Sequence, residues 1–307
     1  MIAFVFPGQG SQTVGMGKEM YDEFATAADY LDAFDDEADF PLLLIMFEGP
    51  NERLTATQNA QPALVAHSLT VAQILREEGI VPEIVAGHSL GEYSALAAAN
   101  SFNPFDTIDV VRQRGQFMAE AGRRLGGAMA AVIGLEAEKV EEAVASIETG
   151  DVVVANYNSP AQTVISGDEE AVKAAGEVAA EMGAKRIIPL NVSGAFHSPL
   201  MQQAADRLAE VLADTPMDDA EIPVVTNVMA APEQRADALR TSLIKQLTEP
   251  VRWVQSVEKM LAMGVDTFVE VGPGRVLSKM LQRANVDADI YSTGSVDGIR
   301  QVIDELG

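Results

Sequence analysis

The sequence predicts an α/β protein in which a large parallel-sheet domain carries a smaller ferredoxin-like subdomain. Three observations lead to this prediction. Short apolar runs typical of strands alternate with longer helical patterns over most of the chain, which favours a parallel sheet covered by helices. One internal block instead has the order βαββαβ, the ferredoxin-like pattern. The length of 307 residues and the hydrophobic fraction of 48% allow a sizeable core.

The first part of the chain contains strands that run directly into helices. Strands are expected at residues 2–7 (IAFVFP) and 83–87 (EIVAG). Apolar residues at helical spacing predict helices over about 16–34 and about 61–78. The strand at 83–87 leads into a helix of small residues, LGEYSALAAAN (90–100).

The internal block covers residues 126–193. Its predicted strands are 128–135, 152–158, 162–167 and 185–192, and its predicted helices are 137–148 and 169–183. Because the βαββαβ order forms a small sheet of its own with helices on one face, we treat this block as a ferredoxin-like subdomain. The large domain then consists of residues 1–125 and 194–307.

The last part of the chain returns to the α/β pattern. A helix is expected over about 199–212, followed by a strand at 222–227 and a further helix. A strand at 267–272 then leads through a turn at Pro273-Gly274 into a helix over 275–285. The large sheet therefore receives strands from both ends of the chain.

The charge balance is the outlying feature of the composition, with 46 acidic residues against 21 basic ones and a formal net charge of −25. Such a surface repels phosphate backbones and anionic lipids, so neither nucleic-acid nor membrane binding is expected. Solubility is a simple explanation for the charge. Adaptation to high salt is a sharper hypothesis, because salt screens the self-repulsion. That hypothesis fails if the protein is fully folded and most active in dilute buffer.

The chain contains no cysteine, which excludes disulfides, thiolate catalysis and cysteine-based metal sites, and we predict no metal site. The first residues lack the basic region, long apolar segment and cleavage site of a signal peptide. No apolar run approaches the roughly 20 residues that span a bilayer. A cytoplasmic protein is expected, with a monomer as the default.

Ser89 is the best candidate for a nucleophile. It lies in GHSLG (87–91), which fits Gly-x-Ser-x-Gly at a junction between a strand and a helix. A sharp turn there lifts the serine clear of the backbone, and the helix start directs N–H groups at a negative charge beside it. The pattern alone is common by chance, and a serine in a turn is more often an N-cap. The position between a strand and an Ala-rich helix reverses that preference.

A nucleophilic serine needs a base whose pKa lies near the working pH, and histidine is the natural choice. The chain has three histidines. His88 adjoins the serine and is expected to be structural, and His67 lies in an apolar helix where a hydrogen-bonded core histidine is the simplest interpretation. His197 follows a strand in the turn SGAFHSP, before a helix that begins with proline. This is a usual place for site residues, so His197 is the favoured base.

A glycine-rich segment and an arginine complete the candidates. PGQGSQ (7–12) follows the first strand, but the third glycine of G-x-G-x-x-G falls on Thr13, so phosphate binding is weakly supported. A glycine turn at a strand end can also present a backbone N–H to an oxyanion. Arg114 lies 25 residues after Ser89, and its residue type alone favours a solvated helix charge.

Four segments together resemble the malonyl-CoA:acyl carrier protein transacylase family: FVFPGQGSQ (4–12), GHSLGE (87–92), the arginine of RQRGQFM (112–118) and GAFHSPLM (194–201). Four further segments also match motifs of that family: QPAL (61–64), NYNSP (156–160), QLTEPVRW (246–253) and VEVGPG (269–274). The resemblance covers essentially the whole chain in order. It implies a hydrolase-like α/β domain with a ferredoxin-like insertion, in agreement with the pattern above.

The resemblance also implies an activity and its residues. The protein would transfer malonyl from malonyl-CoA to the phosphopantetheine thiol of acyl carrier protein, in fatty acid synthesis. Ser89 would form a malonyl ester, and His197 would move the protons. The N–H groups of Gln9 and Leu90 would form the oxyanion hole. Arg114 would bind the malonyl carboxylate through its planar guanidinium. No cofactor is implied, because malonyl-CoA is the substrate and the carrier brings the phosphopantetheine.

Other residues are assigned by the same resemblance. A main-chain carbonyl near Gln246 would orient the histidine in place of a carboxylate, and Gln61, Asn156 and Asn158 would line the pocket. The ring of Phe196 would leave no room for an α-methyl branch. Since one methyl group is worth about 1–3 kcal/mol, we expect a preference for malonyl over methylmalonyl rather than exclusion.

Acyl carrier proteins are acidic, so docking onto this acidic chain requires a local basic patch, high salt or both. The candidate docking residues are Lys185, Arg186, Arg275, Lys279 and Arg283. The last three recur every four residues along one helical face, although a solvated basic face explains them equally well.

Two other functions stay open from the sequence. An α/β serine hydrolase would share the turn around Ser89 but would need a third acidic residue and access for water. A non-catalytic homologue within a larger synthase would not need Ser89, His197 and Arg114 together.

Overall fold

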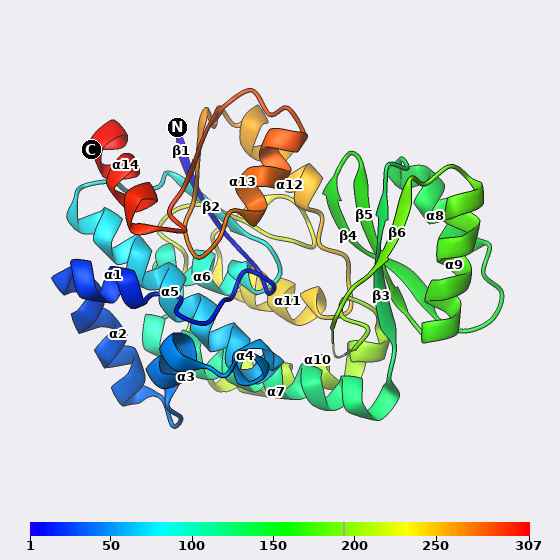
Figure 1. The fold of residues 1–307 in the computed structure, drawn as a ribbon, viewed down its shortest axis with the longest axis horizontal. Coiled ribbons are helices and arrows are strands. Elements are labelled where there is room, and N and C mark those ends of the chain that lie inside the picture. Colours follow the sequence, from blue (N-terminus) through cyan, green and yellow to red (C-terminus); the bar gives the residue numbers. More distant parts are fainter. Residues whose placement is uncertain (193) are drawn as a thin grey trace.

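The computed structural model describes residues 1–192 and 194–307, which form two sheets with their helices (Figure 1). The large sheet has six strands. The first five in spatial order run parallel to one another, and the sixth is antiparallel to its neighbour. In spatial order they are β10 (Asp289–Ser292), β9 (Thr267–Glu270), β1 (Ile2–Phe6), β2 (Ile84–Gly87), β7 (Val224–Val225) and β8 (Pro232–Glu233).

The two faces of the large sheet are covered by different helices. Phe4 and Phe6 of β1 point to one face, and Ala3 and Val5 to the other, as strand alternation requires. The core on the first face is shared with buried residues of α1 (Lys18–Glu23), α2 (Ala25–Glu37), α3 (Leu42–Glu48), α4 (Asn51–Thr55), α5 (Thr57–Glu77), α6 (Gly91–Ala98), α7 (Pro104–Leu125), α10 (Gln202–Asp214), α11 (Ala236–Gln246) and α14 (Val296–Leu306). The second face packs against α12 (Trp253–Ala262) and α13 (Val276–Arg283).

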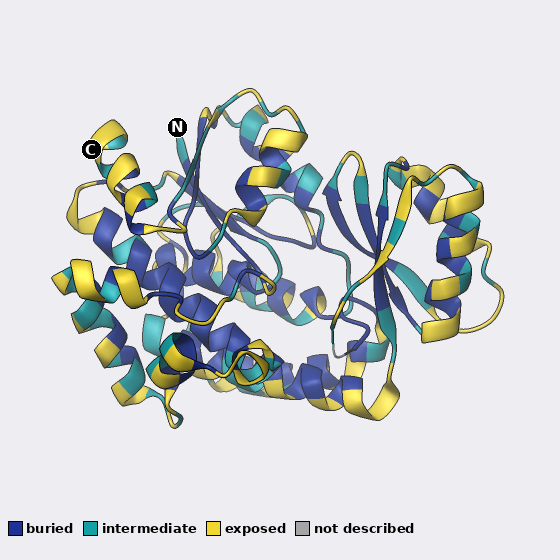
Figure 2. Cartoon of the chain, in the orientation of Figure 1, coloured by how far each residue is buried: buried dark blue, intermediate teal, exposed yellow. Residues whose placement is uncertain are grey.

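Burial follows this layering. The central strands and the helices α5 and α6 are dark in Figure 2, whereas the outer surfaces of α1, α2 and α14 are largely exposed. A parallel sheet covered on both faces explains why its strands read as continuous apolar runs rather than as an alternating pattern.

The second sheet is antiparallel and lies beside the large one (Figure 1). Its strands in spatial order are β4 (Val152–Ser159), β5 (Gln162–Gly167), β3 (Ala128–Ile133) and β6 (Arg186–Pro189). The helices α8 (Ala137–Ala145) and α9 (Glu169–Glu181) bury their apolar residues against it. Both the strand order and the βαββαβ chain order are ferredoxin-like, so the predicted fold class is confirmed. Ser193, the predicted end of this subdomain, lies outside the described residues.

Several predicted elements differ in extent from those observed. The helix expected over 16–34 is two helices, because Phe24 has extended backbone angles (φ −118°, ψ 121°) and ends one helix while it starts the next. The helix expected from Pro199 begins as a 3-10 turn, Pro199–Met201, before α10. The strand β10 and the terminal helix α14 were not predicted. The latter buries Val296, Ile299 and Val302 at helical spacing.

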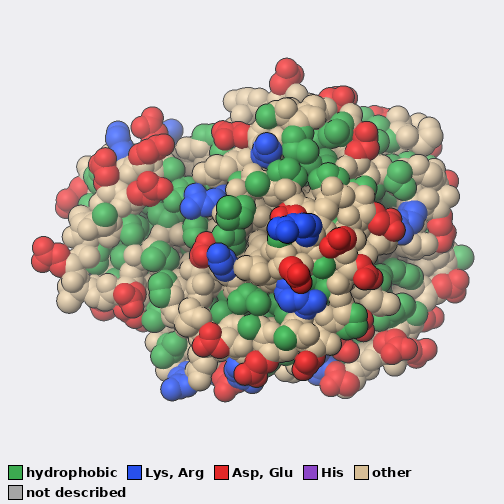
Figure 3. Space-filling view, turned by 180° about the vertical axis from the view of Figure 1, so that it is seen from behind, with side chains coloured by type: hydrophobic (Ala, Val, Ile, Leu, Met, Phe, Trp, Pro, Cys, Tyr) green, Lys and Arg blue, Asp and Glu red, His purple; other side chains and the backbone are tan. Residues whose placement is uncertain are grey.

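No helix within residues 1–192 or 194–307 has the length and apolar character needed to cross a membrane. Seen from behind, the surface carries many Asp and Glu side chains, most densely around its outline, with fewer Lys and Arg side chains scattered among them (Figure 3).

Candidate active site

Ser89 lies in a tight turn between β2 and α6. Its backbone has φ 51°, a left-handed conformation that non-glycine residues rarely adopt. The glycines on either side let the strand and the helix approach closely: a Cβ added to Gly91 would lie 2.0 Å from the Phe6 carbonyl oxygen, and one added to Gly87 would lie 1.9 Å from the Gly91 carbonyl carbon. The Ser89 N–H donates to Asn227 Oδ1 at 2.6 Å. The turn is thus fixed from two sides and presents the Ser89 side chain.

The His197 ring faces the Ser89 hydroxyl. Its Nε2 lies 2.9 Å from Ser89 Oγ, and its Nδ1 lies 2.7 Å from the main-chain carbonyl oxygen of Gln246. Because a carbonyl oxygen only accepts, Nδ1 carries the proton and Nε2 is free to accept one from the serine. Burial, aided by the nearby Arg114 charge, lowers the pKa of His197 to about 3. The ring is therefore a neutral base at neutral pH.

Arg114 projects from α7 toward the same serine. It is 1% exposed, so the solvated helix charge favoured by residue type alone is wrong. Its Nη2 donates to Ser89 Oγ at 3.2 Å and to Gln246 Oε1 at 3.0 Å, and its Nη1 donates to Gln61 Oε1 at 2.8 Å. Among the described residues no carboxylate forms a salt bridge with it. The charge is held by neutral acceptors and is available to an anion.

Two glutamine side chains frame this guanidinium. Gln61, in α5, is fully buried, and its Nε2 lies 3.4 Å from the Met118 sulfur while its oxygen accepts from Arg114. Gln246, the last residue of α11, is also fully buried. Its main-chain oxygen orients His197 and its side-chain oxygen accepts from Arg114, so one residue contacts both.

A cavity of about 490 Å³ opens beside Ser89 and lies between the two sheets. It is lined by residues that include Gln9, Ser89, Leu90, Arg114, Asn156, Asn158, Phe196 and His197. Asn158 Oδ1 lies 2.7 Å from His88 Nε2, which ties the histidine next to Ser89 to the second sheet. Gln61 lies behind Arg114 and does not line the cavity.

The N–H groups of Gln9 and Leu90 are positioned by two different turns. Leu90 directly precedes α6, and Gln9 follows β1 on the glycine-rich segment. A Cβ added to Gly8 would lie 2.6 Å from the His88 carbonyl oxygen, so this glycine allows the segment to close over the serine turn. Neither N–H donates to another described residue, which leaves both free for a ligand oxygen.

Two residues of this site were missed by the sequence analysis. Glu92, fully buried in α6, accepts at Oε2 from Gln246 Nε2 (2.7 Å) and from the Asn227 N–H (3.1 Å). Asn227 also donates from Nδ2 to the Gly87 carbonyl oxygen at 2.5 Å. Glu92 was within the quoted GHSLGE motif, whereas the only signal for Asn227 was a polar residue at the end of a predicted strand.

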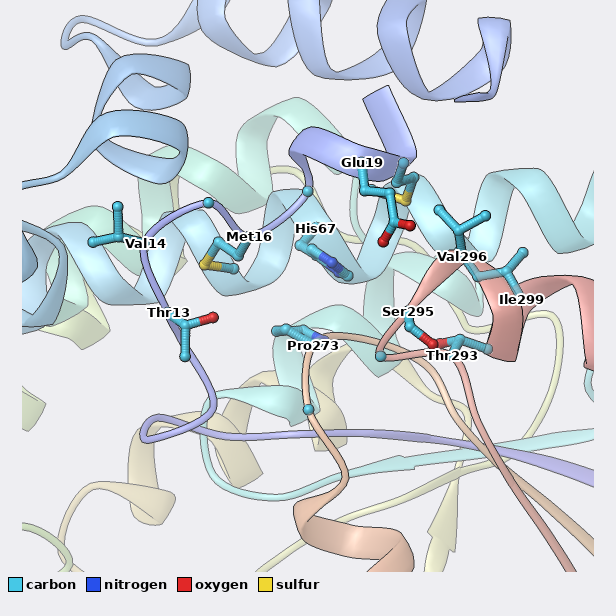
Figure 4. Close-up of a pocket in the computed structure, with 15 residues that line it drawn as sticks. Thr13, Val14, Met16, Glu19, His67, Pro273, Thr293, Ser295, Val296 and Ile299 are labelled. Carbon is cyan, nitrogen blue, oxygen red and sulfur yellow. The ribbon is translucent and has the colours of Figure 1, made fainter. Parts of the chain in front are cut away.

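A second cavity, of about 250 Å³, lies at the carboxyl ends of β1, β9 and β10 and is lined by none of the residues that line the cavity beside Ser89 (Figure 4). His67 of α5 lies on its wall, which also includes Glu19 and Ser295 (Figure 4). His67 is 5% exposed, and its Nδ1 has no hydrogen-bond partner among the described residues. His67 is therefore buried as expected of a core histidine, but the expected hydrogen bond is missing at Nδ1. Burial lowers the pKa of His67 to about 4.

The chain is similar to known acyltransferases over nearly its whole length. An acyl transferase domain family matches residues 3–301. A malonyl CoA-acyl carrier protein transacylase from Bacillus subtilis is 48% identical over 286 residues, which cover 92% of this chain and 90% of that protein. The structure of an acyl-carrier-protein S-malonyltransferase from Bartonella henselae is 41% identical, with a TM-score of 0.95 and coverage of 100% and 99% of the two chains. A malonyl-transacylase solved in complex with a type II PKS acyl-carrier protein is 38% identical, with a TM-score of 0.95 and 99% coverage of each chain.

Proposed function

Because the chain belongs to the malonyl CoA-acyl carrier protein transacylase family, we propose that it moves malonyl from malonyl-CoA to the phosphopantetheine thiol of an acyl carrier protein. The transfer passes through a seryl ester and supplies malonyl-carrier protein for fatty acid synthesis. The observation that carries the proposal is the position of Ser89 Oγ, 2.9 Å from a neutral imidazole nitrogen and 3.2 Å from a buried guanidinium. In a malonyl thioester the reacting carbonyl and the carboxylate are one methylene apart, which suits a nucleophile and a cation this close.

The first half-reaction forms the ester. Ser89 Oγ attacks the thioester carbonyl while His197 Nε2 takes the hydroxyl proton. The oxyanion that forms accepts from the Gln9 and Leu90 N–H groups, each typically worth about 3–4 kcal/mol. Collapse of the tetrahedral intermediate breaks the carbon–sulfur bond, and the departing CoA sulfur takes the proton from His197. Arg114 holds the malonyl carboxylate throughout.

The second half-reaction runs the same steps with another thiol. The carrier's phosphopantetheine thiol gives its proton to His197 as the sulfur attacks the ester carbonyl. Ser89 leaves and regains the proton. The carbonyl oxygen of Gln246 supports the charged imidazole without becoming charged itself, so no third acidic residue is needed.

Other residues act on the choice of acyl group. Phe196 is 6% exposed and borders the cavity, where its ring limits branching next to the carbonyl. Asn158 also borders it, and Gln61 keeps Arg114 in place from behind. We also infer that residues 126–193 act as one subdomain, with 1–125 and 194–307 forming the other wall of the cleft.

The carrier is proposed to dock beside the cavity mouth. Val276, Leu277 and Met280 of α13 border the active-site cavity, while Lys279 of the same helix is exposed. A neighbouring cavity of about 570 Å³ is lined by both Arg186 and Arg283, which come from the two subdomains. An acidic carrier would meet these cations on either side of the entrance.

Intact-protein mass spectrometry tests the function. Mixing with malonyl-CoA is expected to add one malonyl group to the wild type and none to Ser89→Ala. The adduct should persist in buffer and disappear when holo acyl carrier protein is added. Loss of the adduct to water alone would favour a serine hydrolase, and no adduct on folded protein at low or high salt would reject the proposal.

Docking is tested with Lys279→Glu, which should raise KM for the carrier protein and leave KM for malonyl-CoA unchanged. Glu258→Lys, on the exposed part of α12, is a control with the opposite change of charge.

No cluster of His, Asp and Glu in the described part of the chain could hold a metal ion. Monomeric state, cytoplasmic location and adaptation to high salt stay predictions.

A further inference from the structure

We propose that Glu92 is a positioning residue: it fixes which way the Gln246 side-chain amide faces and thereby holds Arg114 for a carboxylated acyl group. This inference rests on the malonyl transfer proposed above. Glu92 contacts neither the acyl group's cavity nor the reacting atoms, and it acts through Gln246.

The first step concerns the two ends of the Gln246 amide. Its Nε2 donates to Glu92 Oε2 at 2.7 Å and to the Ser89 carbonyl oxygen at 3.0 Å. Its Oε1 accepts from Arg114 Nη2 at 3.0 Å. If the amide were rotated by half a turn, its oxygen would face two acceptors and its nitrogen would face a donor. All three contacts therefore agree on one orientation.

The second step separates the contributions. The Ser89 carbonyl oxygen already accepts from the Glu92 N–H at 3.1 Å, in the first turn of α6. Of the two hydrogen bonds that the amide nitrogen donates, the one to Glu92 Oε2 is the shorter, and the Glu92 side chain is fully buried. A carboxylate oxygen is also the stronger acceptor of the two. Removal of Glu92 would thus remove most of the preference of the amide for its present orientation.

The third step leads to selectivity. With the amide rotated, Nε2 of Gln246 would point at Arg114 and the guanidinium would lose its acceptor on that side, leaving only Gln61. The malonyl carboxylate needs a fixed guanidinium to gain two parallel hydrogen bonds. Acetyl transfer needs the hydroxyl of Ser89, the base His197 with its main-chain acceptor and the oxyanion-hole N–H groups, but it places no carboxylate on Arg114.

Glu92 also ties the site to the rest of the fold. Its Oε2 accepts from the Asn227 N–H, and Asn227 Oδ1 accepts from the Ser89 N–H. Burial raises the pKa of Glu92 to about 7, against the opposing effect of the hydrogen bonds from Gln246 and Asn227. A proton on Oε1, which has no partner among the described residues, would leave Oε2 an acceptor. The positioning role is therefore kept in either protonation state.

The test compares malonyl with acetyl transfer in matched variants. Glu92→Gln keeps an acceptor oxygen for Gln246 and Asn227, so its kcat/KM for malonyl-CoA should stay within about threefold of wild type. Glu92→Leu has no acceptor, and its malonyl-to-acetyl ratio of kcat/KM should fall at least about tenfold, chiefly through a higher KM for malonyl-CoA. Gln246→Met keeps the main-chain oxygen and should lower the ratio in the same direction, which preserves the test if Glu92→Leu does not fold.

Leu96→Ala, fully buried in the same helix and outside the hydrogen-bonded network, controls for general loss of stability. It should leave the ratio unchanged. An unchanged ratio in Glu92→Leu, or an equal loss in Glu92→Gln, would overturn the positioning role. If the wild type itself transfers no malonyl, the proposed function fails instead, so the two failures are distinguishable.

Discussion

Replacement of Arg114 by alanine should change the acyl preference of the enzyme more than its ability to transfer an acyl group. In the wild type the guanidinium is 1% exposed and lies 3.2 Å from the nucleophile. The neutral oxygens of Gln61 and Gln246 hold it in place. A malonyl carboxylate bound there would be a buried, hydrogen-bonded charge pair, while an acetyl group has nothing to pair with the cation.

The size of the effect follows from that burial. Truncation of one partner of a buried, hydrogen-bonded charge pair costs about 2–5 kcal/mol. With each 1.4 kcal/mol worth a factor of ten, kcat/KM for malonyl-CoA should fall by about 30- to 5,000-fold. Acetyl-CoA loses no ionic contact, so its kcat/KM should change by less than about tenfold. Arg114→Lys keeps one charge but not two parallel donors, and it should lie between the wild type and Arg114→Ala.

The assay is the rate of ester formation on Ser89 from each CoA thioester, followed by quenched mass spectrometry. Thermal unfolding of each variant, monitored by circular dichroism, is the control for folding. Equal losses with malonyl-CoA and acetyl-CoA in a folded variant would refute the assignment of Arg114 to the carboxylate. A loss in the lysine variant as large as in the alanine variant would show that geometry, and not charge, is what matters.

Three other predictions concern the base, the turn and a buried histidine. His197→Ala should slow ester formation by about 100- to 10,000-fold with little change in KM, and an unchanged rate would exclude it as the base. Gly91→Ala places a Cβ 2.0 Å from the Phe6 oxygen and should lower the free energy of unfolding in urea by about 3 kcal/mol, the upper end of the usual cost of overpacking. Burial keeps His67 neutral down to pH about 4, whereas an unfolded chain binds the proton below about pH 6.5. The free energy of unfolding should therefore decrease as the pH falls from 6.5, by about 2 kcal/mol at pH 5. Between pH 8 and pH 5, His67→Gln should lose about 2 kcal/mol less unfolding free energy than the wild type. A difference in unfolding free energy between the two proteins that does not change with pH would contradict this.

The sequence was sufficient for the parts of the site that depend on local pattern. The turn at Ser89 could be predicted because a strand, two glycines and a helix follow one another within a few residues. His197 could be favoured because there are only three histidines: His88 adjoins the serine, His67 lies in an apolar helix, and His197 lies in a turn between a strand and a helix that begins with proline. The fold class could be predicted for the same reason: the alternation of elements and the βαββαβ block are both visible along the chain.

The remaining parts depend on contacts between distant segments. The burial of Arg114 results from the packing of α7 against α5, so residue type alone gave the wrong environment for it. The contacts of Glu92 with Asn227 and Gln246 join residues more than 130 positions apart. The oxygen that orients His197 belongs to the main chain. Because any residue has such an oxygen, the residue type does not indicate it, and only the family resemblance pointed to Gln246.

The neutral surroundings of Arg114 explain how such a site can select an anionic acyl group. If Glu92 touched the guanidinium directly, an internal ion pair would have to be broken each time a malonyl carboxylate entered, and much of the binding energy would be cancelled. The Gln246 amide instead stands between them, with its nitrogen toward Glu92 and its oxygen toward Arg114. Glu92 fixes the orientation of the Gln246 amide, and the amide oxygen fixes the position of the Arg114 guanidinium. The guanidinium still forms no salt bridge with a described residue. On the proposed assignment, a malonyl carboxylate would pair with this cation, whereas an acetyl group would leave a buried cation without a partner.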